Sequence, residues 1–372
     1  MLEPESGSRV LFFSGGTALG PIAAELSRFT RNAVHVITTF DSGGSSAELR
    51  RVFGMPAVGD IRARIMALAD RNVPGNAETI ALLGYRLPTD AAPEGLRREL
   101  VALAAGEHPL TAAIPEPMHE VITRHLSAFL ALMPESMNLA GASIGNLVLT
   151  SGYLSLDRRL EPVVTAFSRM VAARGLVRPV ADACAHLCVR LANGEIINGQ
   201  HRFTGKVGTA ISSPIVDMWL TASLEDPAPI RIAAYPRLAD VIRLSDLICY
   251  PVGSFFSSVM ANLLPSGVCA AIREARCPKV FIPNLGNDPE LFGLTVRDQV
   301  AHLLRMGEAE GCGPQDMLHW LLVDEDDSRY PGGIPSEWLS RLGIRVRRAP
   351  LVVAPPYLDP AAVCAALAGA WV

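Results

Sequence analysis

Two apolar runs, each followed by a glycine-rich polar loop, constrain the fold of this chain more than any other feature. Residues 9–14 (RVLFFS) are typical of a buried strand, and the loop GGTALG leads into PIAAELSRF (21–29), which has helical periodicity. Residues 33–40 (AVHVITTF) are rich in β-branched residues and predict a second strand. Two strands joined by such a helix form a βαβ unit, so we expect them to be parallel with a right-handed crossover.

The remainder of the chain continues this alternation. Helical patterns dominate from about residue 60 to 175, and strands follow, with Asn193-Gly194 as a hairpin signal between apolar runs. Further strand patterns begin near residues 247, 278 and 344, before a C-terminal helical pattern. These features predict a single α/β domain over residues 1–372, with a doubly wound, mostly parallel Rossmann-like sheet. We expect a helical insertion at about 72–175 and a small antiparallel flap in a β-rich segment at about 176–235.

The composition narrows the class of partner. The formal net charge is −4 and the pI about 6.1, so no general attraction to nucleic acid or anionic membranes is expected. No apolar run is long enough for a membrane span, and the acidic N-terminal segment does not resemble a signal peptide. Cys184, His186 and Cys188 would share one face of a strand, but no fourth zinc ligand lies nearby. We therefore expect reduced thiols and a cytoplasmic protein.

Three polar, glycine-bearing loops follow predicted strands, at residues 14–20, 41–46 and 253–258. The carboxyl ends of parallel strands share one rim of a sheet, where ligands bind. A helix N-terminus there exposes unpaired N–H groups, and glycine lets an anion approach the backbone. The first loop alone could be a tight turn, because it matches neither a Walker loop nor G-x-G-x-x-G. The nucleotide- or phosphate-binding candidates in these loops are Gly15, Gly16, Thr17, Ala18, Leu19, Ser42, Gly43, Gly44, Ser45, Ser46, Gly253, Ser254 and Ser257.

Asp41 ends the second predicted strand, and its position allows several roles. Its carboxylate could bond ribose hydroxyls, hold Mg²⁺ or accept a proton from an attacking hydroxyl. It could also cap the helix that begins near Ser46. Arg62, in the first turn after Gly59-Asp60, is the better candidate for a phosphate contact, because Arg64 points elsewhere on the same helix.

Five segments together resemble the CofD/YvcK-like family. They are Gly15-Gly16-Thr17, FDSGGSS (40–46), GMPAVGDIR (54–62), ASIGNL (142–147) and GSFFSSVMANLL (253–264), in the order and spacing of that family. The family includes 2-phospho-L-lactate transferase, which joins a phospholactyl unit from a guanosine diphospho-lactate to the deazaflavin Fo. It also includes YvcK-type proteins, which look like regulators that bind a UDP-sugar. The resemblance covers about residues 8–305 and is closer to the YvcK branch.

The resemblance implies a function and a set of roles. It implies a nucleotide-dependent transferase that moves a phosphoryl-linked group from a nucleoside diphosphate conjugate to an acceptor hydroxyl. Asp41 and Asp60 would be catalytic, Asp41 would hold Mg²⁺, and Asn146 would lie beside the phosphates. The alternative is a non-catalytic nucleotide-sugar sensor, because the family usually has two adjacent acids where this chain has Asp41-Ser42.

Two further expectations concern subfamily and assembly. Ala261 stands where the YvcK branch tends to have proline, which indicates a divergent subfamily. The apolar composition and the long helical insertion suggest a homodimer, as members of the resembled family form.

Overall fold

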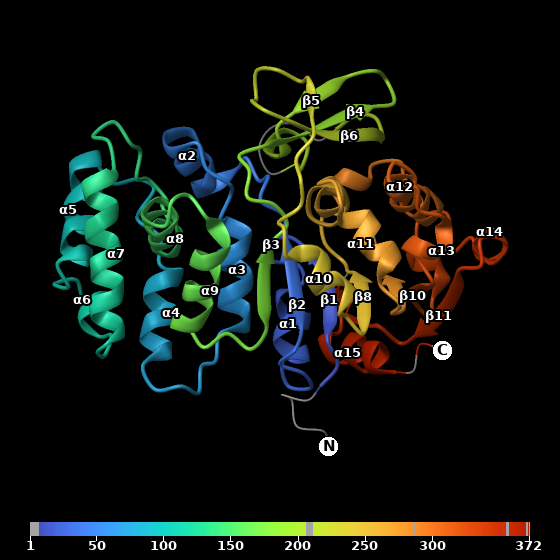
Figure 1. Ribbon diagram of the computed structural model, residues 1–372, viewed down its shortest axis with the longest axis horizontal. Helices are drawn as coiled ribbons and strands as arrows, with labels where there is room; N and C mark the ends of the chain where they lie inside the picture. The colour runs from blue at the N-terminus through green and yellow to red at the C-terminus, as the bar shows by residue number, and fades with distance from the viewer. Residues whose placement is uncertain (1–6, 206–210, 286–287, 355–356, 370, 372) are drawn as a thin grey trace.

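The computed structural model describes residues 7–205, 211–285, 288–354, 357–369 and 371. In this described part a seven-stranded sheet runs through the middle of the molecule (Figure 1). Its strands, in spatial order, are β11 (Arg345–Ala349), β10 (Trp320–Asp324), β9 (Lys279–Phe281), β8 (Leu247–Tyr250), β1 (Val10–Ser14), β2 (Val34–Ile37) and β3 (Leu176–Pro179). Neighbouring strands pair in parallel throughout. Because β1 lies between β2 and β8, the chain winds outward in both directions, which confirms the predicted doubly wound fold.

Side chains of the central strands alternate between two apolar layers. Leu11 and Phe13 belong to one buried cluster, whereas Val10 and Phe12 belong to another on the opposite face. The helices α1 (Gly20–Leu26) and α15 (Pro360–Ala368) cover the face of Val10 and Phe12. The opposite face packs against α10 (Leu238–Arg243), α11 (Val268–Glu274), α12 (Val296–Glu308), α13 (Pro314–Met317) and α14 (Ser336–Arg341). Both faces are therefore buried, as a parallel sheet requires.

A group of helices packs beside the β2–β3 edge of the sheet and forms a third apolar cluster (Figure 1). These elements are α2 (Gly44–Phe53), α3 (Gly59–Leu68), α4 (Asn76–Gly84), α5 (Pro93–Ala104), α6 (Pro109–Ala112), α7 (Met118–Leu132), α8 (Ile144–Ser155) and α9 (Leu160–Met170). The start of α3 is close to the rim of the sheet, which places Asp60 and Arg62 near the predicted loops.

A four-stranded antiparallel sheet, which we call the flap, stands above the rim (Figure 1). It consists of β4 (His186–Leu191), β5 (Ile196–Asn198), β6 (Ile215–Thr221) and β7 (Pro229–Ile230), in the order β5-β4-β6-β7. Asn193-Gly194 joins β4 to β5, with Gly194 at φ +89°, which confirms the predicted hairpin. After β5 the chain forms a short 3₁₀ turn, η2 (Gln200–Arg202), which returns toward the rim.

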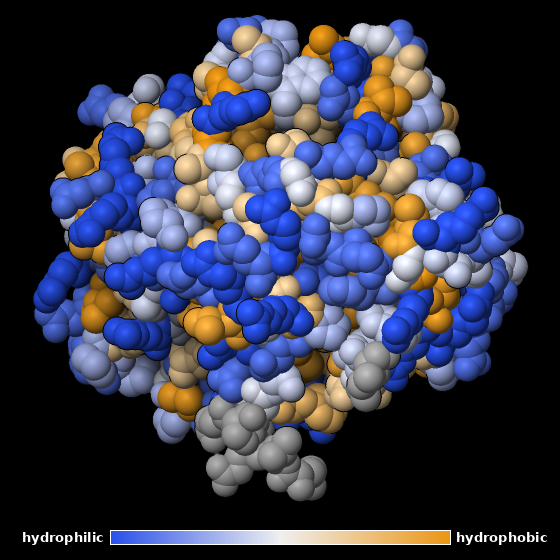
Figure 2. Space-filling model, turned by 45° about the vertical axis from the view of Figure 1, so that its right-hand side comes forward, coloured by the Kyte–Doolittle hydropathy of each residue, from blue (hydrophilic) through white to orange (hydrophobic). Residues whose placement is uncertain are grey.

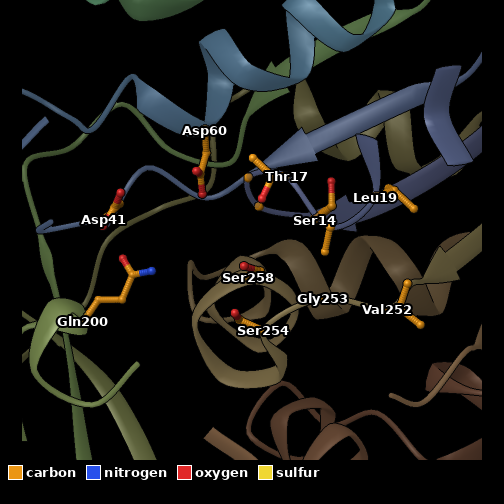
Figure 3. Close-up of a pocket in the computed structure, with 13 residues that line it drawn as sticks. Ser14, Thr17, Leu19, Asp41, Asp60, Gln200, Val252, Gly253, Ser254 and Ser258 are labelled. Atoms are coloured by element: carbon orange, nitrogen blue, oxygen red, sulfur yellow. The ribbon is translucent and has the colours of Figure 1, made fainter. Parts of the chain in front are cut away.

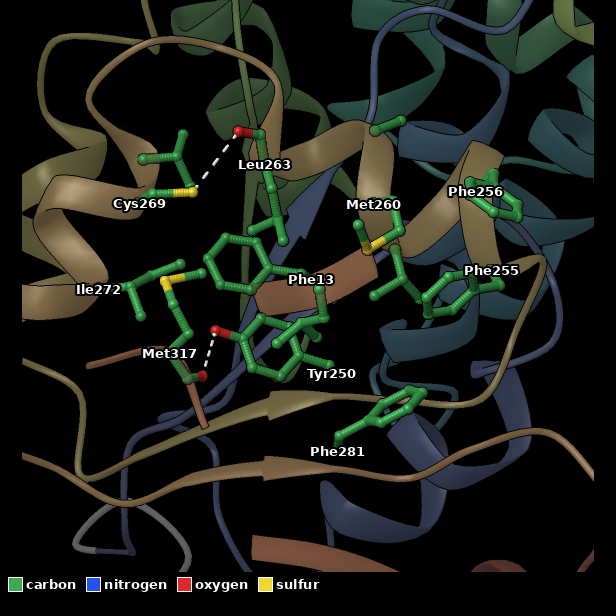
Figure 4. Close-up of a cluster of buried hydrophobic side chains, with 14 of the residues drawn as sticks. Phe13, Tyr250, Phe255, Phe256, Met260, Leu263, Cys269, Ile272, Phe281 and Met317 are labelled. Carbon is green, nitrogen blue, oxygen red and sulfur yellow. Dashed lines mark hydrogen bonds between the residues drawn. The ribbon is translucent and has the colours of Figure 1, made fainter. Parts of the chain in front are cut away.

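The segment after β8 is not a regular α-helix. It forms a π turn, η3 (Phe255–Val259), followed by a 3₁₀ turn, η4 (Met260–Leu263). Phe255 and Phe256 are adjacent yet both buried, and they sit in the cluster that Figure 4 shows around Phe13 and Tyr250. A π turn is wider than an α-helical turn and leaves room for two consecutive buried rings. Asp288 and Glu290 accept the backbone N–H groups of this segment.

The remaining elements complete the C-terminal half. They are η5 (Pro289–Leu291), η6 (Asp327–Arg329), β12 (Val352–Ala354) and β13 (Tyr357–Leu358). On the face that Figure 2 presents, hydrophilic and hydrophobic residues are interspersed. Among the residues that the structure describes, no helix combines the length and apolar character needed to traverse a bilayer.

Candidate functional site

A cleft in two connected parts lies at the rim of the sheet, where β8, β1 and β2 end (Figure 3). One part, of about 220 Å³, is lined by Ser14, Gly15, Gly16, Thr17, Ala18, Leu19, Asp41, Asp60, Gln200, Val252, Gly253, Ser254 and Ser258. The other, of about 230 Å³, is lined by Thr17, Asp41, Gly43, Gly44, Ser45, Ser46, Gly59, Asp60, Arg62, Ala63, Arg86, Asn146, Gln200, His201 and Thr204. The residues common to both parts are Thr17, Asp41, Asp60 and Gln200. The cleft lies at the carboxyl end of β1, where the strand order reverses between β2 on one side and β8 on the other. This is the usual ligand position in such sheets.

The first loop, residues 15–19, crosses this rim between β1 and α1. A Cβ on Gly15 would clash with the Ser258 hydroxyl, and one on Gly16 would lie 2.6 Å from Asp60 Oδ1. A side chain at Gly15 would therefore displace Ser258, and one at Gly16 would displace the Asp60 carboxylate, so glycine lets the loop fit between α3 and η3. In the described part of the chain, the N–H groups of Gly16, Thr17 and Ala18 have no protein acceptor. They are available to an anion in the cleft.

The second loop, residues 41–46, presents the N-terminus of α2. The helix begins at Gly44, two residues before the predicted start, and Gly43 is its N-cap. Asp41 Oδ1 accepts the N–H of Gly43 at 2.9 Å, so Asp41 closes the turn that leads into the helix. The N–H groups of the first turn, at residues 44–46, have no intrahelical acceptor and line the cleft. This ten-residue helix thus offers a second set of donors to an anion.

Two arginines and an amide form the cationic wall of the cleft. Arg62 Nε donates to Asn146 Oδ1 at 3.0 Å, and Asn146 Nδ2 donates to the Ser45 hydroxyl at 3.0 Å. Arg86 donates to the same hydroxyl at 3.2 Å. Burial and the neighbouring Arg86 lower the pKa of Arg62 to about 10, so the Arg62 guanidinium stays charged at neutral pH. Sequence reasoning missed Arg86, which lies 24 residues after Arg62 and carries no motif.

Side-chain acceptors occupy four of the backbone N–H groups of the third loop, residues 253–258. Phe255 N–H donates to Asp288 at 2.8 Å, and the N–H groups of Phe256 and Ser257 donate to Glu290 Oε2, each at 2.8 Å. Gly253 N–H donates to Asn284 Oδ1 at 3.0 Å. This loop lines the cleft but does not offer these N–H groups to a ligand.

The serine predicted in the third loop lies outside the cleft. Ser257 is 2% exposed and its hydroxyl bonds to Glu290, so the neighbouring Ser258 lines the cleft instead. Glu290 is completely buried, and burial together with Asp288 raises its pKa to about 8. The π turn explains the difference, because it changes which of the two serines points outward. Sequence spacing alone does not predict a π turn.

Ser42 also lies outside both parts of the cleft. Its hydroxyl is 2.8 Å from His201 Nδ1, and it accepts the N–H of His201 at 3.3 Å. Burial and Arg202 lower the pKa of His201, against the opposing effect of Asp41. His201 and Gln200 come from η2 of the flap, and Gln200 extends its amide toward the cleft (Figure 3). The sequence carried no signal for either residue, because the flap returns to the rim only in three dimensions.

Asp41 and Asp60 bring two carboxylates to the same cavity (Figure 3). Within the described residues, no group of three or more His, Cys, Asp or Glu is arranged to hold a metal ion. The protein ligands that the cavity offers to a cation are one or two carboxylates, next to loops with unpaired N–H groups. Mg²⁺ is commonly held in this way, with the substrate phosphates and water as its other ligands.

Curated relatives match most of the chain at low identity. A putative gluconeogenesis factor from Nostoc sp. (strain PCC 7120) is 26% identical over 353 residues, covering 91% of this chain and 62% of the relative. The gluconeogenesis factor of Bacillus subtilis (strain 168) is 25% identical over 357 residues, covering 92% of this chain and 91% of the relative. The chain therefore spans less than two thirds of the Nostoc relative but most of the B. subtilis one.

A solved structure and a family model agree with these matches. The crystal structure of a UPF0052 family member from Bacillus halodurans superposes with a TM-score of 0.71 at 21% identity, covering 98% of this chain and 99% of the other. The likeness confirms the fold. The family model described as 2-phospho-L-lactate transferase CofD matches residues 10–335, which contain every residue of the cleft. The resemblance found in the sequence is thereby confirmed, and the chain belongs to the CofD family.

Proposed function

We propose that the protein is a nucleotide-dependent transferase that moves a phosphoryl-linked group from a nucleoside diphosphate conjugate to an acceptor hydroxyl. One observation carries this proposal: two carboxylates, Asp41 and Asp60, line the same cavity as a glycine loop with unpaired N–H groups. Carboxylates repel phosphate, whereas a transferase uses such groups as a proton acceptor or a metal ligand.

The two loops and the cationic wall suit a diphosphate. The first loop provides N–H groups at one end of the cleft, and the start of α2 provides them at the other. Arg62 and Arg86 add two charges that persist at neutral pH. Asp41, Asp60, Thr17 and Gln200 border both parts of the cleft. We therefore propose that the reacting phosphorus lies at this junction.

The chemistry requires one new P–O bond and the loss of another. The acceptor oxygen bonds to the phosphorus that carries the transferred group, and the P–O–P bond of the conjugate breaks, releasing a nucleoside monophosphate. The proton of the acceptor hydroxyl passes to Asp41, which uses Oδ1 for the turn and keeps Oδ2 without a hydrogen-bond partner in the described residues. Mg²⁺, when bound, neutralises negative charge on the diphosphate. Asp41 would hold it, and Asp60 is the other carboxylate of the cavity.

A non-catalytic nucleotide-sugar regulator is the second candidate. The position of Ser42 favours it, because the hydroxyl that replaces the family's second acid bonds to His201 instead of facing the cleft. The names of the curated relatives are also compatible with a regulatory role. A regulator would use the same diphosphate contacts without turnover.

Binding and turnover, measured separately, test the two candidates. Calorimetric titration with GDP and UDP-sugars tests binding, and an assay with guanosine diphospho-lactate and Fo tests transfer. Nucleotide binding with transfer that Asp41→Asn abolishes supports the transferase. Tight binding of a UDP-sugar with no transfer supports the regulator, and absence of all binding refutes both.

Assembly and location stay proposals. We propose a cytoplasmic homodimer, and light scattering that shows a monomer at micromolar concentration would refute the dimer.

A further inference from the structure

Arg64 is a completely buried cation on α3, one turn after Asp60. Its side chain is 0% exposed, and burial lowers its pKa to about 10, against the opposing effect of Asp60. The guanidinium therefore remains charged at neutral pH. Nε and Nη1 have no hydrogen-bond partner in the described part of the chain. A buried cation with unpaired donors costs free energy, so its presence calls for a compensating interaction.

The contacts of Arg64 are with the backbone of the first loop. Nη2 donates to the carbonyl oxygen of Gly15 at 3.2 Å and to that of Gly16 at 3.1 Å. In a trans peptide group the C=O and the following N–H point in opposite directions. Holding these two carbonyls toward Arg64 thus turns the N–H groups of Gly16 and Thr17 away from it. Those N–H groups have no protein acceptor among the described residues, and both residues line the cleft.

The hydrogen bonds from Arg64 to these two carbonyls also make the N–H groups of Gly16 and Thr17 stronger donors. A carbonyl that accepts a hydrogen bond from a cation polarises its peptide group, so the N–H of that group becomes a better donor. The buried charge also lies in a region of low dielectric constant, where its attraction for an anion across the loop is weakly screened. A bound diphosphate would in turn compensate the buried cation.

We propose that Arg64 is a positioning residue that orients and polarises the Gly15–Gly16 and Gly16–Thr17 peptide groups for binding a diphosphate. This inference rests on the proposed function, since it assumes a nucleoside diphosphate in the cleft. Arg64 does not touch the ligand. Its role is distinct from that of Arg62, which lines the cleft itself.

Arg64→Met and Arg64→Lys separate this role from simple packing. Methionine has a similar length and no buried charge, so Arg64→Met should fold with little loss of thermal stability. Lysine keeps the charge but cannot hold both carbonyls with a planar group. The control is Arg178→Met, because Arg178 is a partly buried arginine on β3 that also donates to a backbone carbonyl, away from the cleft.

The affinities for GDP, inorganic pyrophosphate and guanosine are measured by calorimetry. The melting temperature of each variant is measured separately. Arg64→Met should weaken GDP and pyrophosphate binding by about 10- to 100-fold while guanosine binding stays unchanged. Arg64→Lys should recover part of the loss, and Arg178→Met should bind like the parent. A merely structural role would lower all three affinities together or lower stability alone.

The outcomes distinguish this inference from the proposed function. If the parent protein binds neither GDP nor a UDP-sugar, the proposed function fails. If the parent binds and folded Arg64→Met binds equally well, only the inference on Arg64 is overturned. Failure of both Arg64 variants to fold would make Arg64 a structural residue and would also overturn the inference.

Discussion

The first and third loops look alike in sequence and differ in what they offer a ligand. Each follows a buried strand and begins with glycine, and each lines the cleft. In the first loop Arg64 holds the carbonyls and the N–H groups remain without protein acceptors in the described residues. In the third loop the N–H groups of residues 255–257 donate to Asp288 and Glu290. A glycine-rich turn after a strand can therefore offer its N–H groups to a ligand only where no side chain of the protein accepts them.

Asp41, which begins the second loop, and Asp288, which anchors the third loop, should differ most in their effect on catalysis. Asp41→Asn should lower transferase activity by a factor of about 10² to 10⁴ with little change in melting temperature. Asp288→Asn should instead lower stability, because it weakens the anchor of Phe255 N–H. Rate measurements on both purified variants check this. Equal rate losses in the two variants would contradict the distinction.

Glycine substitutions in the first loop test the approach of ligand to backbone. Gly16→Ala should weaken diphosphate binding by about 100-fold, because its Cβ would contact Asp60 and displace the loop. The matched control is Gly20→Ala at the start of α1, where a Cβ meets only Ala67 at 3.9 Å. Calorimetry on both variants decides the point. Parent-like affinity in folded Gly16→Ala would show that the loop does not bind phosphate.

The buried carboxyl group of the third loop should make stability depend on pH. The folded-state pKa of Glu290 is raised from 4.5 to about 8, so folding favours the protonated form. The stabilising contribution is complete below about pH 4.5 and is lost as the pH rises through about 8. Within that window the free energy of unfolding should fall by up to about 1.4 kcal/mol per pH unit. Glu290→Gln preserves the acceptor for both N–H groups and should flatten this dependence in denaturant unfolding at pH 5 to about 9. An unchanged slope would assign the effect to another group.

Substitutions of the two adjacent serines should give the smallest effects, one on stability and the other on nucleotide affinity. Ser257→Ala removes a buried hydroxyl bonded to Glu290 and should cost about 1 kcal/mol of stability without altering nucleotide affinity. Ser258→Ala removes a hydroxyl that lines the cleft beside Gly15, and should change affinity by less than about tenfold at constant stability. Thermal unfolding and calorimetry on both variants measure the two effects. The reverse assignment would mean that Ser257 faces the ligand.

The parts of the molecule set by local pattern could be predicted from the sequence. The βαβ unit, the Asn193-Gly194 hairpin and the sheet class follow from apolar periodicity and turn chemistry, which act over a few residues. The same patterns brought the first two loops and the start of α3 to one rim, because parallel strands share their carboxyl ends.

The remainder depends on contacts between distant segments. Glu290 reaches Ser257 across 33 residues and His201 reaches Ser42 across 159 residues, and no local pattern encodes either contact. Arg64 was expected to point away from the site, and it does avoid the cleft, but its guanidinium lies against the carbonyls of the first loop. Helical spacing gives the face of a side chain and not the backbone that packs against it.

Backbone amide signals of the glycines would test the central claim most directly. A sample labelled with ¹⁵N only at glycine reports the amides of Gly16, Gly44 and Gly253. The N–H groups of Gly16 and Gly44 have no acceptor in the described residues, whereas that of Gly253 donates to Asn284. On addition of GDP, the amide protons of Gly16 and Gly44 should move downfield as they donate to phosphate oxygens, while Gly253 moves little. Guanosine alone should leave Gly16 and Gly44 near their original positions. A shift of Gly253 with unmoved Gly16 and Gly44 would contradict the account.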